Sequence, residues 1–442
     1  MSKLQTLMLN KNYLEGPLPE SIGQCMQLAK LQCQRNRFSD CIPESIFRLP
    51  LLQSVNFESN LIISKTPPAY KASAECIEMG DTQLIPKIVD TASDCVSGRT
   101  SPPPSTSLDL QSPNVASNQI EGDRGTLVGG SLSLSMLDLS RNNLSGRLPN
   151  YIKSLKNLKD LRLNENNLHG PFPPEIEGLA NLNSLSLCRN QFSGLIPDLI
   201  SSLATLKKLD LSWNLFGGGI PNSITSLVNL TDLVLNHNEL SGRLQTEIGF
   251  LASLVTLDLS HNRFCGEIPE SIRSLTRLRR LDLSHNQLTG EIPPCVFMLS
   301  KLCTLQLNNN SLTGPLDHNQ INGDLPTDTR DLKRLQSVNF SHNLLSGPIS
   351  AFILSCRFTE SLNLSNNCFS GTLPGGSLQN LEFIETLDLS NNQLSGLIPE
   401  SFDGCSKLEL LDLSGNDFEG DLPERFRTQP ADKPIIPFRW EK

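Results

Sequence analysis

Leucines and polar residues alternate in short stretches that recur from one end of the chain to the other. Leu281 and Leu283 flank Asp282, which predicts a short strand with its leucines directed inward and its polar side chains outward. Upstream, apolar residues stand at every third position from Ile272 to Leu278, a spacing that suits a short 3₁₀ or helical segment. The pattern therefore predicts a coil built from one strand, one bend and one helical segment.

An asparagine marks the bend after each strand and repeats every 24 residues over the middle of the chain. Its side chain supplies both a donor and an acceptor to backbone groups that the bend leaves without partners. A fixed period of this length predicts a solenoid in which each coil packs on the next. The evenly spaced ladder asparagines are Asn142, Asn166, Asn190, Asn214, Asn238, Asn262, Asn286 and Asn310. Further copies are Asn12, Asn36, Asn60, Asn343, Asn367, Asn392 and Asn416.

A glycine and a proline complete each unit, as in Gly146–Pro149 and Gly290–Pro293. The full spacing, L-x-x-L-x-L-x-x-N-x-L-x-G-x-I-P, resembles the plant-type leucine-rich repeats of receptor kinases, receptor-like proteins and polygalacturonase-inhibiting proteins. The resemblance covers about four fifths of the chain. It implies an α/β solenoid, a right-handed leucine-rich repeat superhelix with a parallel concave sheet and short 3₁₀ or helical convex segments.

Breaks in the period predict the domain organisation. Residues 1–61 hold N-terminal repeats, 62–134 form a Pro/Ser-rich insertion expected to be disordered, 135–426 form the main solenoid, and 427–442 form a Pro-containing tail. A degenerate coil is expected around Asn118–Gly122, which lies one period before Asn142. The spacing widens to 33 residues after Asn310, which predicts a bulging loop at Asp317–Asn322.

Charge and motifs exclude several function classes. The net charge of -9 argues against a nucleic-acid partner, and no apolar run approaches the length of a membrane span. No catalytic motif stands in the sequence, so the chain is expected not to be an enzyme. None of the 12 cysteines forms a metal spacing, and neither a cofactor nor a metal is expected.

The ends of the chain and its possible N-glycosylation triplets bear on its cellular localisation. The family's paired-cysteine caps and a signal sequence are missing, which indicates a fragment, a truncated gene model or an intracellular relative. The resemblance implies an extracellular or cell-surface protein, whereas the missing signal sequence leaves a cytoplasmic one open. Asn-x-Ser/Thr triplets predict glycosylation in a secreted ancestor. These triplets begin at Asn143, Asn229, Asn309, Asn339 and Asn363.

The residue just before each ladder asparagine defines one column across the predicted sheet. This column holds four of the six histidines, three of them on adjacent strands, and it also holds Trp213. Two interpretations of these histidines stay open. They form a pH-sensitive stripe, or histidine is simply frequent at this position because Leu-Ser-His-Asn is a common sequence of this repeat. Trp213 is a candidate anchor for a partner. The candidate ligand-binding face consists of Trp213, Asp232, His237, Val255, His261, Arg279 and His285.

The resemblance implies a recognition module that acts in signalling or defence. Such a module would bind a protein or peptide ligand on its concave face and signal through a partner such as a co-receptor kinase. Two alternatives remain open from the sequence. One is an inhibitor of a cell-wall hydrolase, and the other is an intracellular leucine-rich repeat scaffold.

Overall fold

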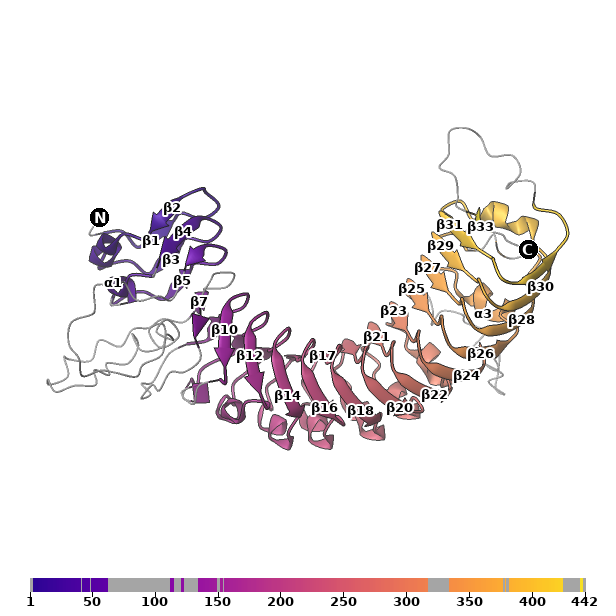
Figure 1. The fold of residues 1–442 in the computed structure, drawn as a ribbon, viewed down its shortest axis with the longest axis horizontal. Helices are drawn as coiled ribbons and strands as arrows, with labels where there is room; N and C mark the ends of the chain where they lie inside the picture. Colours follow the sequence, from indigo (N-terminus) through magenta and orange to yellow (C-terminus); the bar gives the residue numbers. More distant parts are fainter. Residues whose placement is uncertain are drawn as a thin grey trace. The chain divides into compact units, whose positions relative to one another are not determined.

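A computed structural model describes residues 3–40, 42–47, 49–62, 112–114, 121–122, 134–148, 152–153, 155–316, 334–376, 378, 381–423 and 438–439. The chain falls into two compact units, Met1–Gly217 and Gly218–Lys442. Each unit contains a main ladder, formed by the short strands with alternating leucines. Each also contains a side ladder, formed by the strands that follow the ladder asparagines (Figure 1).

All pairings in the main ladder of the first unit are parallel. Its strands, in spatial order, are β1 (Thr6–Met8), β3 (Lys30–Gln32), β5 (Ser54–Asn56), β7 (Ser112–Asn114), β9 (Met136–Asp138), β11 (Asp160–Arg162), β13 (Ser184–Ser186) and β15 (Lys208–Asp210). The side ladder has two runs, β2 (Glu15–Pro17), β4 (Arg37–Asp40) and β6 (Leu61–Ile62), then β8 (Glu121–Gly122), β10 (Asn143–Gly146), β12 (Asn167–Gly170), β14 (Gln191–Leu195) and β16 (Leu215–Gly218).

The second unit repeats this plan. Its main ladder runs β17 (Asp232–Val234), β19 (Thr256–Asp258), β21 (Arg280–Asp282), β23 (Thr304–Gln306), β25 (Ser337–Asn339), β27 (Ser361–Asn363), β29 (Thr386–Asp388), β31 (Leu410–Asp412) and β33 (Phe438–Arg439). Its side ladder contains β18 (Glu239–Arg243), β20 (Arg263–Gly266), β22 (Gln287–Glu291), β24 (Ser311–Pro315), β26 (Leu344–Gly347), β28 (Cys368–Thr372), β30 (Gln393–Leu397) and β32 (Asp417–Glu419). In this unit the main ladder lines the inner side of the curve (Figure 1).

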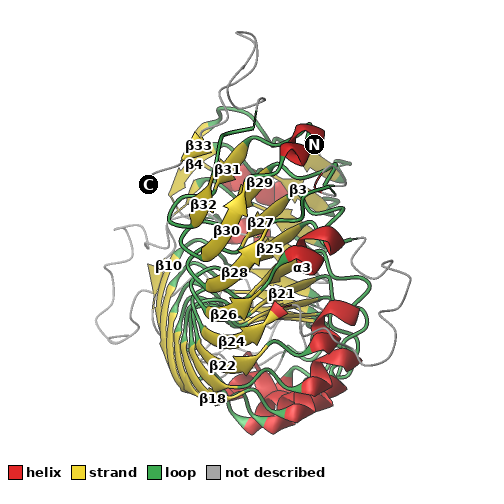
Figure 2. Ribbon diagram, turned by 90° about the vertical axis from the view of Figure 1, so that its right-hand side faces the viewer, coloured by secondary structure: helices red, strands yellow, loops and turns green. Residues whose placement is uncertain are grey.

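Short helices form the third wall of each coil, on the side away from the main ladder (Figure 2). Most are 3₁₀ helices that close by i to i+3 bonds, as where the N–H of Leu275 donates to the Ile272 carbonyl at 3.0 Å. In the α-helix α3, the N–H of Ile353 donates to the Ile349 carbonyl, four residues earlier, at 2.9 Å. The first unit contains η1 (Glu20–Gln24), α1 (Glu44–Phe47), η4 (Pro174–Gly178) and η5 (Asp198–Ser202). The second contains η6 (Asn222–Ser226), η7 (Thr246–Phe250), η8 (Glu270–Ser274), η9 (Pro294–Met298), α3 (Ser350–Ser355) and η12 (Glu400–Gly404).

The leucines that alternate along the strands form the core. Leu257, Leu281 and Leu305 lie in register on β19, β21 and β23 and are 1% exposed or less. Burying one leucine side chain contributes about 1.5–3 kcal/mol. Because each coil adds several such residues, the repeat is stabilised coil by coil through contacts with its neighbours. The predicted solenoid of parallel strands with short 3₁₀ segments is confirmed.

Some expectations fall on residues that the structure does not describe. The loop at Asp317–Asn322 and most of 62–134 lie outside the described residues, as does the tail apart from β33. Within 62–134, β7 lies between β5 and β9, and β8 pairs with β10. The domain boundaries drawn from the sequence stay a prediction.

Candidate functional site

The residue before each ladder asparagine has a left-handed backbone in both units. Every non-glycine member of this column among the described residues has a φ between 52° and 59°. The backbone holds this conformation through neighbouring coils: the N–H of His261 donates to the Ser284 carbonyl at 2.9 Å, and its carbonyl accepts from the N–H of Asn238 at 3.2 Å. Histidine and asparagine are enriched in this region of φ, which gives a structural reason for their frequency here.

The ladder asparagines fix the bend that presents the column. In the second unit the Nδ2 of Asn262 donates to the carbonyls of Leu235 and Leu259 at 3.0 and 3.1 Å. Its Oδ1 accepts from the N–H of Leu240 at 3.0 Å. Asn190 makes the equivalent bonds in the first unit. Each side chain therefore ties its own coil to the preceding one, and the column residue is held in a fixed place beside it.

Three members of the column stack on one another in the second unit. The ring centroids of His237 and His261 are 4.0 Å apart with an interplanar angle of 11°, and those of His261 and His285 are 3.9 Å apart with an angle of 12°. His261 and His285 are exposed, and His237 is half-buried. We call these three residues the imidazole stack. Its ring faces cover one another, so the ring edges are the part that a ligand meets.

Two asparagine amides contact the ring at the end of the stack. The Nδ2 atoms of Asn308 and Asn309 approach Nε2 of His285 at 3.4 and 3.3 Å. An amide nitrogen only donates, so these contacts are hydrogen bonds in the neutral tautomer that carries its proton on Nδ1. Partial burial lowers the pKa of His285, and the neighbouring His261 lowers it further, while Asp282 opposes the shift.

Buried carboxylates lie beneath the stack. Oδ1 of Asp258 accepts from the Ser260 hydroxyl at 2.7 Å, and Asp282 and Ser284 make the same contact at 2.6 Å. Nη2 of Arg280 bridges the two carboxylates, at 3.3 Å from Asp258 and 2.8 Å from Asp282.

Two effects compete at the middle of the stack. Partial burial lowers the pKa of His261, and the charge of His237 lowers it further, while Asp282 and Asp258 raise it. The pKa of His261 is lowered overall. The stack therefore favours the uncharged form of its middle ring.

The column of the first unit has different chemistry. Nε of Arg141 pairs with Oε1 of Glu165 at 3.1 Å, and the guanidinium of Arg189 lies 4.7 Å from the ring centroid of Trp213. Trp213 remains 43% exposed. A cation over an indole face is favourable by electrostatics, and the pair offers a flat surface with a positive charge at one side.

The other candidate face residues lie at the start of the strands. The N–H of Arg279 donates to the carbonyl of Val255 at 2.8 Å, so these two residues are neighbours on adjacent strands. Asp232, in β17, accepts from the Thr231 hydroxyl at 2.8 Å. The structure thus places His237, His261 and His285 together and Val255 beside Arg279 at the opposite end of the strands. Trp213 belongs to the first unit.

The predicted glycosylation sites differ in exposure. Asn143 and Asn229 are exposed, whereas Asn309, Asn339 and Asn363 are half-buried. The side-chain oxygens of Asn339 and Asn363 accept from the backbone N–H groups two residues on, at 3.0 Å in both cases. These two asparagines stand where Asp258 and Asp282 stand in earlier coils.

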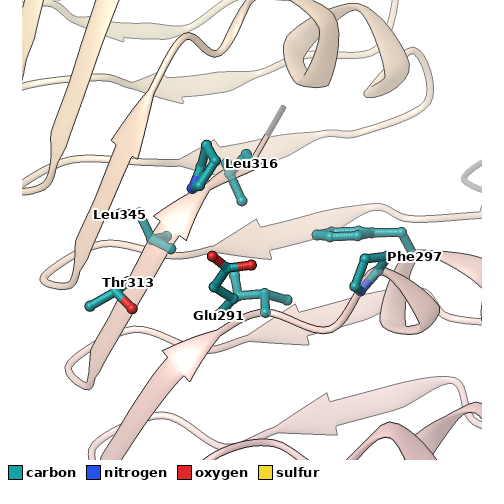
Figure 3. A pocket seen from close by; sticks show the side chains of 8 residues that line it. Glu291, Phe297, Thr313, Leu316 and Leu345 are labelled. Atoms are coloured by element: carbon teal, nitrogen blue, oxygen red, sulfur yellow. The ribbon is translucent and has the colours of Figure 1, made fainter. Parts of the chain in front are cut away.

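Cavities and clusters elsewhere add no second site. A cavity beside β22 and β24, lined by Glu291, Phe297, Thr313 and Leu345 among others, holds about 20 Å³ (Figure 3). That is room for a single water rather than a ligand. Among the residues that the structure describes, no cluster of three or more metal-ligating side chains occurs. Within the same residues, no helix is both long and apolar enough to cross a membrane.

Sequence reasoning missed the bridge that Arg280 forms between the carboxylates of Asp258 and Asp282. The signal was present, because Asp258-Leu-Ser260 recurs as Asp282-Leu-Ser284 and in other coils. An aspartate whose carboxylate accepts from the backbone N–H two residues on is a known local bond, and its repetition at one position would have placed it on several strands, including β19 and β21.

Family models match the repeats along much of the chain. A leucine rich repeat model matches residues 3–25, 133–155, 157–179, 181–203, 205–227, 253–275 and 277–299. A second model of the same description matches residues 357–418. Together these ranges cover about half of the chain.

The similar proteins include plant receptors. Receptor-like protein 31 of Arabidopsis thaliana is 32% identical over 59 residues, which are 13% of this chain and 7% of that protein. The crystal structure of a TDR receptor is 28% identical with a TM-score of 0.81, covering 99% of this chain and 68% of that chain.

The Arabidopsis receptor kinase HAESA was solved in complex with the peptide hormone IDA and the co-receptor SERK1. It is 26% identical to this chain with a TM-score of 0.71, and the match covers 97% of this chain and 72% of that one. The shared fold is a non-enzymatic recognition fold, in agreement with the expectation from the sequence.

Proposed function

We propose that this chain, which belongs to the leucine rich repeat family and carries repeats of the plant type, is a recognition module that binds a peptide or protein ligand on the polar side of its main ladder. The observation that carries the proposal is the column before the ladder asparagines. Its side chains are held in register by the backbone, and they include an aromatic residue that is 43% exposed, Trp213. Side chains fixed in this way lose little conformational entropy when a ligand binds.

The similar proteins support a class of partner and a setting for this chain. HAESA was solved with a peptide hormone and a co-receptor, which supports a peptide ligand and a co-receptor kinase as partners of this chain. Likeness to Receptor-like protein 31 supports a receptor-like role in signalling at the cell surface, and a role in defence is part of the proposal. In this proposal the chain recognises the ligand, and a partner transmits the signal.

Two surfaces are assigned to the ligand. One is the pair of Trp213 and Arg189, a rigid aromatic surface of the kind that anchors protein interfaces. The other is the imidazole stack with Asp232, Val255 and Arg279 on the same main ladder.

The test begins with a random dodecapeptide display library panned against the purified chain. The dissociation constant of a selected peptide is then measured for the wild type, Trp213→Ala and His261→Ala. Loss of an interface anchor weakens binding by about 30-fold or more, which corresponds to about 2 kcal/mol. The matched control is Phe250→Ala in η7, because this phenylalanine is 67% exposed on the helical side.

Unchanged affinity in both main-ladder variants, or an equal loss in the Phe250→Ala control, contradicts the proposal. A chain that selects no peptide but binds and inhibits a cell-wall polygalacturonase would instead favour the inhibitor hypothesis.

A further inference from the structure

The imidazole stack has a feature that its sequence does not require. Left-handed backbone accommodates histidine, but it does not fix where the ring points. In the structure all three rings are parallel within 12° and separated by 3.9–4.0 Å, which is closer than the spacing of about 4.8 Å between the strands that carry them. The rings therefore lean together and present one continuous row of edges.

Charged groups around the stack are few and mostly satisfied. Asp258 and Asp282 face it from β19 and β21, and Arg280 bridges them. Glu239 and Arg263 follow two residues after His237 and His261 and pair with each other at 3.4 Å. His342 stands in the column of the coil beyond Asn309, and its Nε2 lies 3.5 Å from Asn366. The charge of the row is therefore set chiefly by protons on the stack itself.

We propose that His237, His261 and His285 form a proton-gated binding site for an anionic group of the ligand, such as a carboxylate in an acidic peptide segment. This proposal rests on the recognition function proposed above and deepens it, because it names the chemistry that the face selects. When neutral, each ring has one N–H donor and one acceptor nitrogen. When protonated, a ring has two N–H donors and a positive charge, which together fit a carboxylate.

The order of protonation follows from the geometry. His261 has a ring stacked on both of its faces, so a proton there meets two stacked rings, whereas a proton on His237 meets one. A proton on His285 meets one stacked ring, that of His261, and the unstacked His342 beyond it. Protons are therefore expected on the outer rings first, and at His285 the amides of Asn308 and Asn309 must then turn their oxygens toward Nε2. Two positive charges about 8 Å apart, with a neutral ring between them, form a charged row that is absent at higher pH.

The chain itself offers the substitution for a test. Asparagine occupies this column at Asn309, Asn366 and Asn391 with φ of 54–55°, so His→Asn keeps the backbone and removes the titration. We would compare the wild type with the triple variant His237→Asn, His261→Asn, His285→Asn. His342→Asn is the matched control, because it removes a histidine from the same column outside the stack.

The probe is a fluorescein-labelled octapeptide of alternating Asp and Glu, with the Asn and Gln octapeptide as its uncharged counterpart. Fluorescence anisotropy at pH 5.5 and pH 7.5 gives both affinities. We expect the acidic probe to bind wild type about five- to tenfold more tightly at pH 5.5, as two exposed charge pairs allow. The triple variant should lose this ratio, the control should keep it, and the uncharged probe should show none.

The protonation states are read separately, without any ligand. ¹³C-histidine labelling and NMR titration should show His261 protonating after His237 and His285. Equal midpoints for the three rings, or a pH ratio that survives in the triple variant, would overturn the proposal. Failure to select any peptide in the library screen would count against the recognition function alone, because the titration and the acidic probe do not depend on it.

Discussion

The columns before the ladder asparagines in the two units share a backbone and differ in chemistry. In the first unit Arg141 pairs with Glu165, and Arg189 lies over Trp213. In the second unit His237, His261 and His285 stack as three imidazoles. The φ angles of all these residues lie between 52° and 57°. The repeat therefore fixes the position of each column side chain, whereas the residue type at that position differs from coil to coil.

This division separates the residues that hold the fold from those that give the surface its character. Asn190 and Asn262 make the same bonds between their own coil and the preceding one, although one lies in a unit with a charged column and the other beneath the imidazole stack. Substituting a ladder asparagine should therefore lower the free energy of unfolding by a similar amount in either unit. Substituting a column residue should instead have effects that are specific to its unit.

The largest effect is expected at the ladder asparagines. Asn190→Ala or Asn262→Ala leaves a backbone N–H and several carbonyls buried without this side-chain partner. Each variant should lower the free energy of unfolding by about 2–4 kcal/mol. Urea denaturation followed by circular dichroism measures the loss, with the exposed Asn229→Ala as the control. A loss confined to one unit would break the claim that the two share one scaffold.

A smaller effect is expected from the shape of the column residue. Val at position 165 or 261 should lower the free energy of unfolding by about 1–2 kcal/mol, because a β-branched side chain is strained in the left-handed region. Asn at the same positions keeps that conformation and should cost little. Urea midpoints of Glu165→Val, Glu165→Asn, His261→Val and His261→Asn test this directly. If valine were tolerated in one unit only, the backbone of the two columns would not be equivalent in solution.

The leucines and asparagines were predictable because the period alone determines their environment. The alternation of apolar and polar residues directs the side chain of Leu281 into the core, and the repeat places Asn286 at the bend after the strand. The left-handed backbone of the column was missed. Four histidines, three asparagines and a glycine share this column, residue types that tolerate positive φ, so a signal for it was present.

The surface chemistry was only partly predictable. The sequence places Arg189 and Trp213 one period apart in one column, so their contact follows from the register. The separation of 3.9 Å between His261 and His285 does not follow, because it depends on side-chain rotamers that the period leaves open. Neither does the Arg280 bridge, since strand alternation gives the direction of its side chain but not the two carboxylates that its guanidinium reaches.

The smallest effect concerns pH and stability, and it should separate the two columns. The pKa values of His261 and His285 are lowered in the folded state, chiefly by burial. An unfolded histidine has a pKa of about 6.5, so below that pH the unfolded state binds more protons than the folded one. The stabilising effect of these neutral rings is therefore complete above about pH 6.5 and is lost as pH falls toward their folded pKa values.

We expect His261→Asn to reduce the loss of stability between pH 7.5 and 5.5 by less than about 1 kcal/mol, because solvent screens the exposed rings. Arg189→Asn is the counterpart in the first unit, and it should change stability equally at both pH values because arginine stays protonated throughout this range. Thermal unfolding of both variants at the two pH values gives the comparison. An equal pH slope in wild type and His261→Asn would mean that the stack is no harder to protonate than separate histidines, and the difference between the columns would then be one of shape alone.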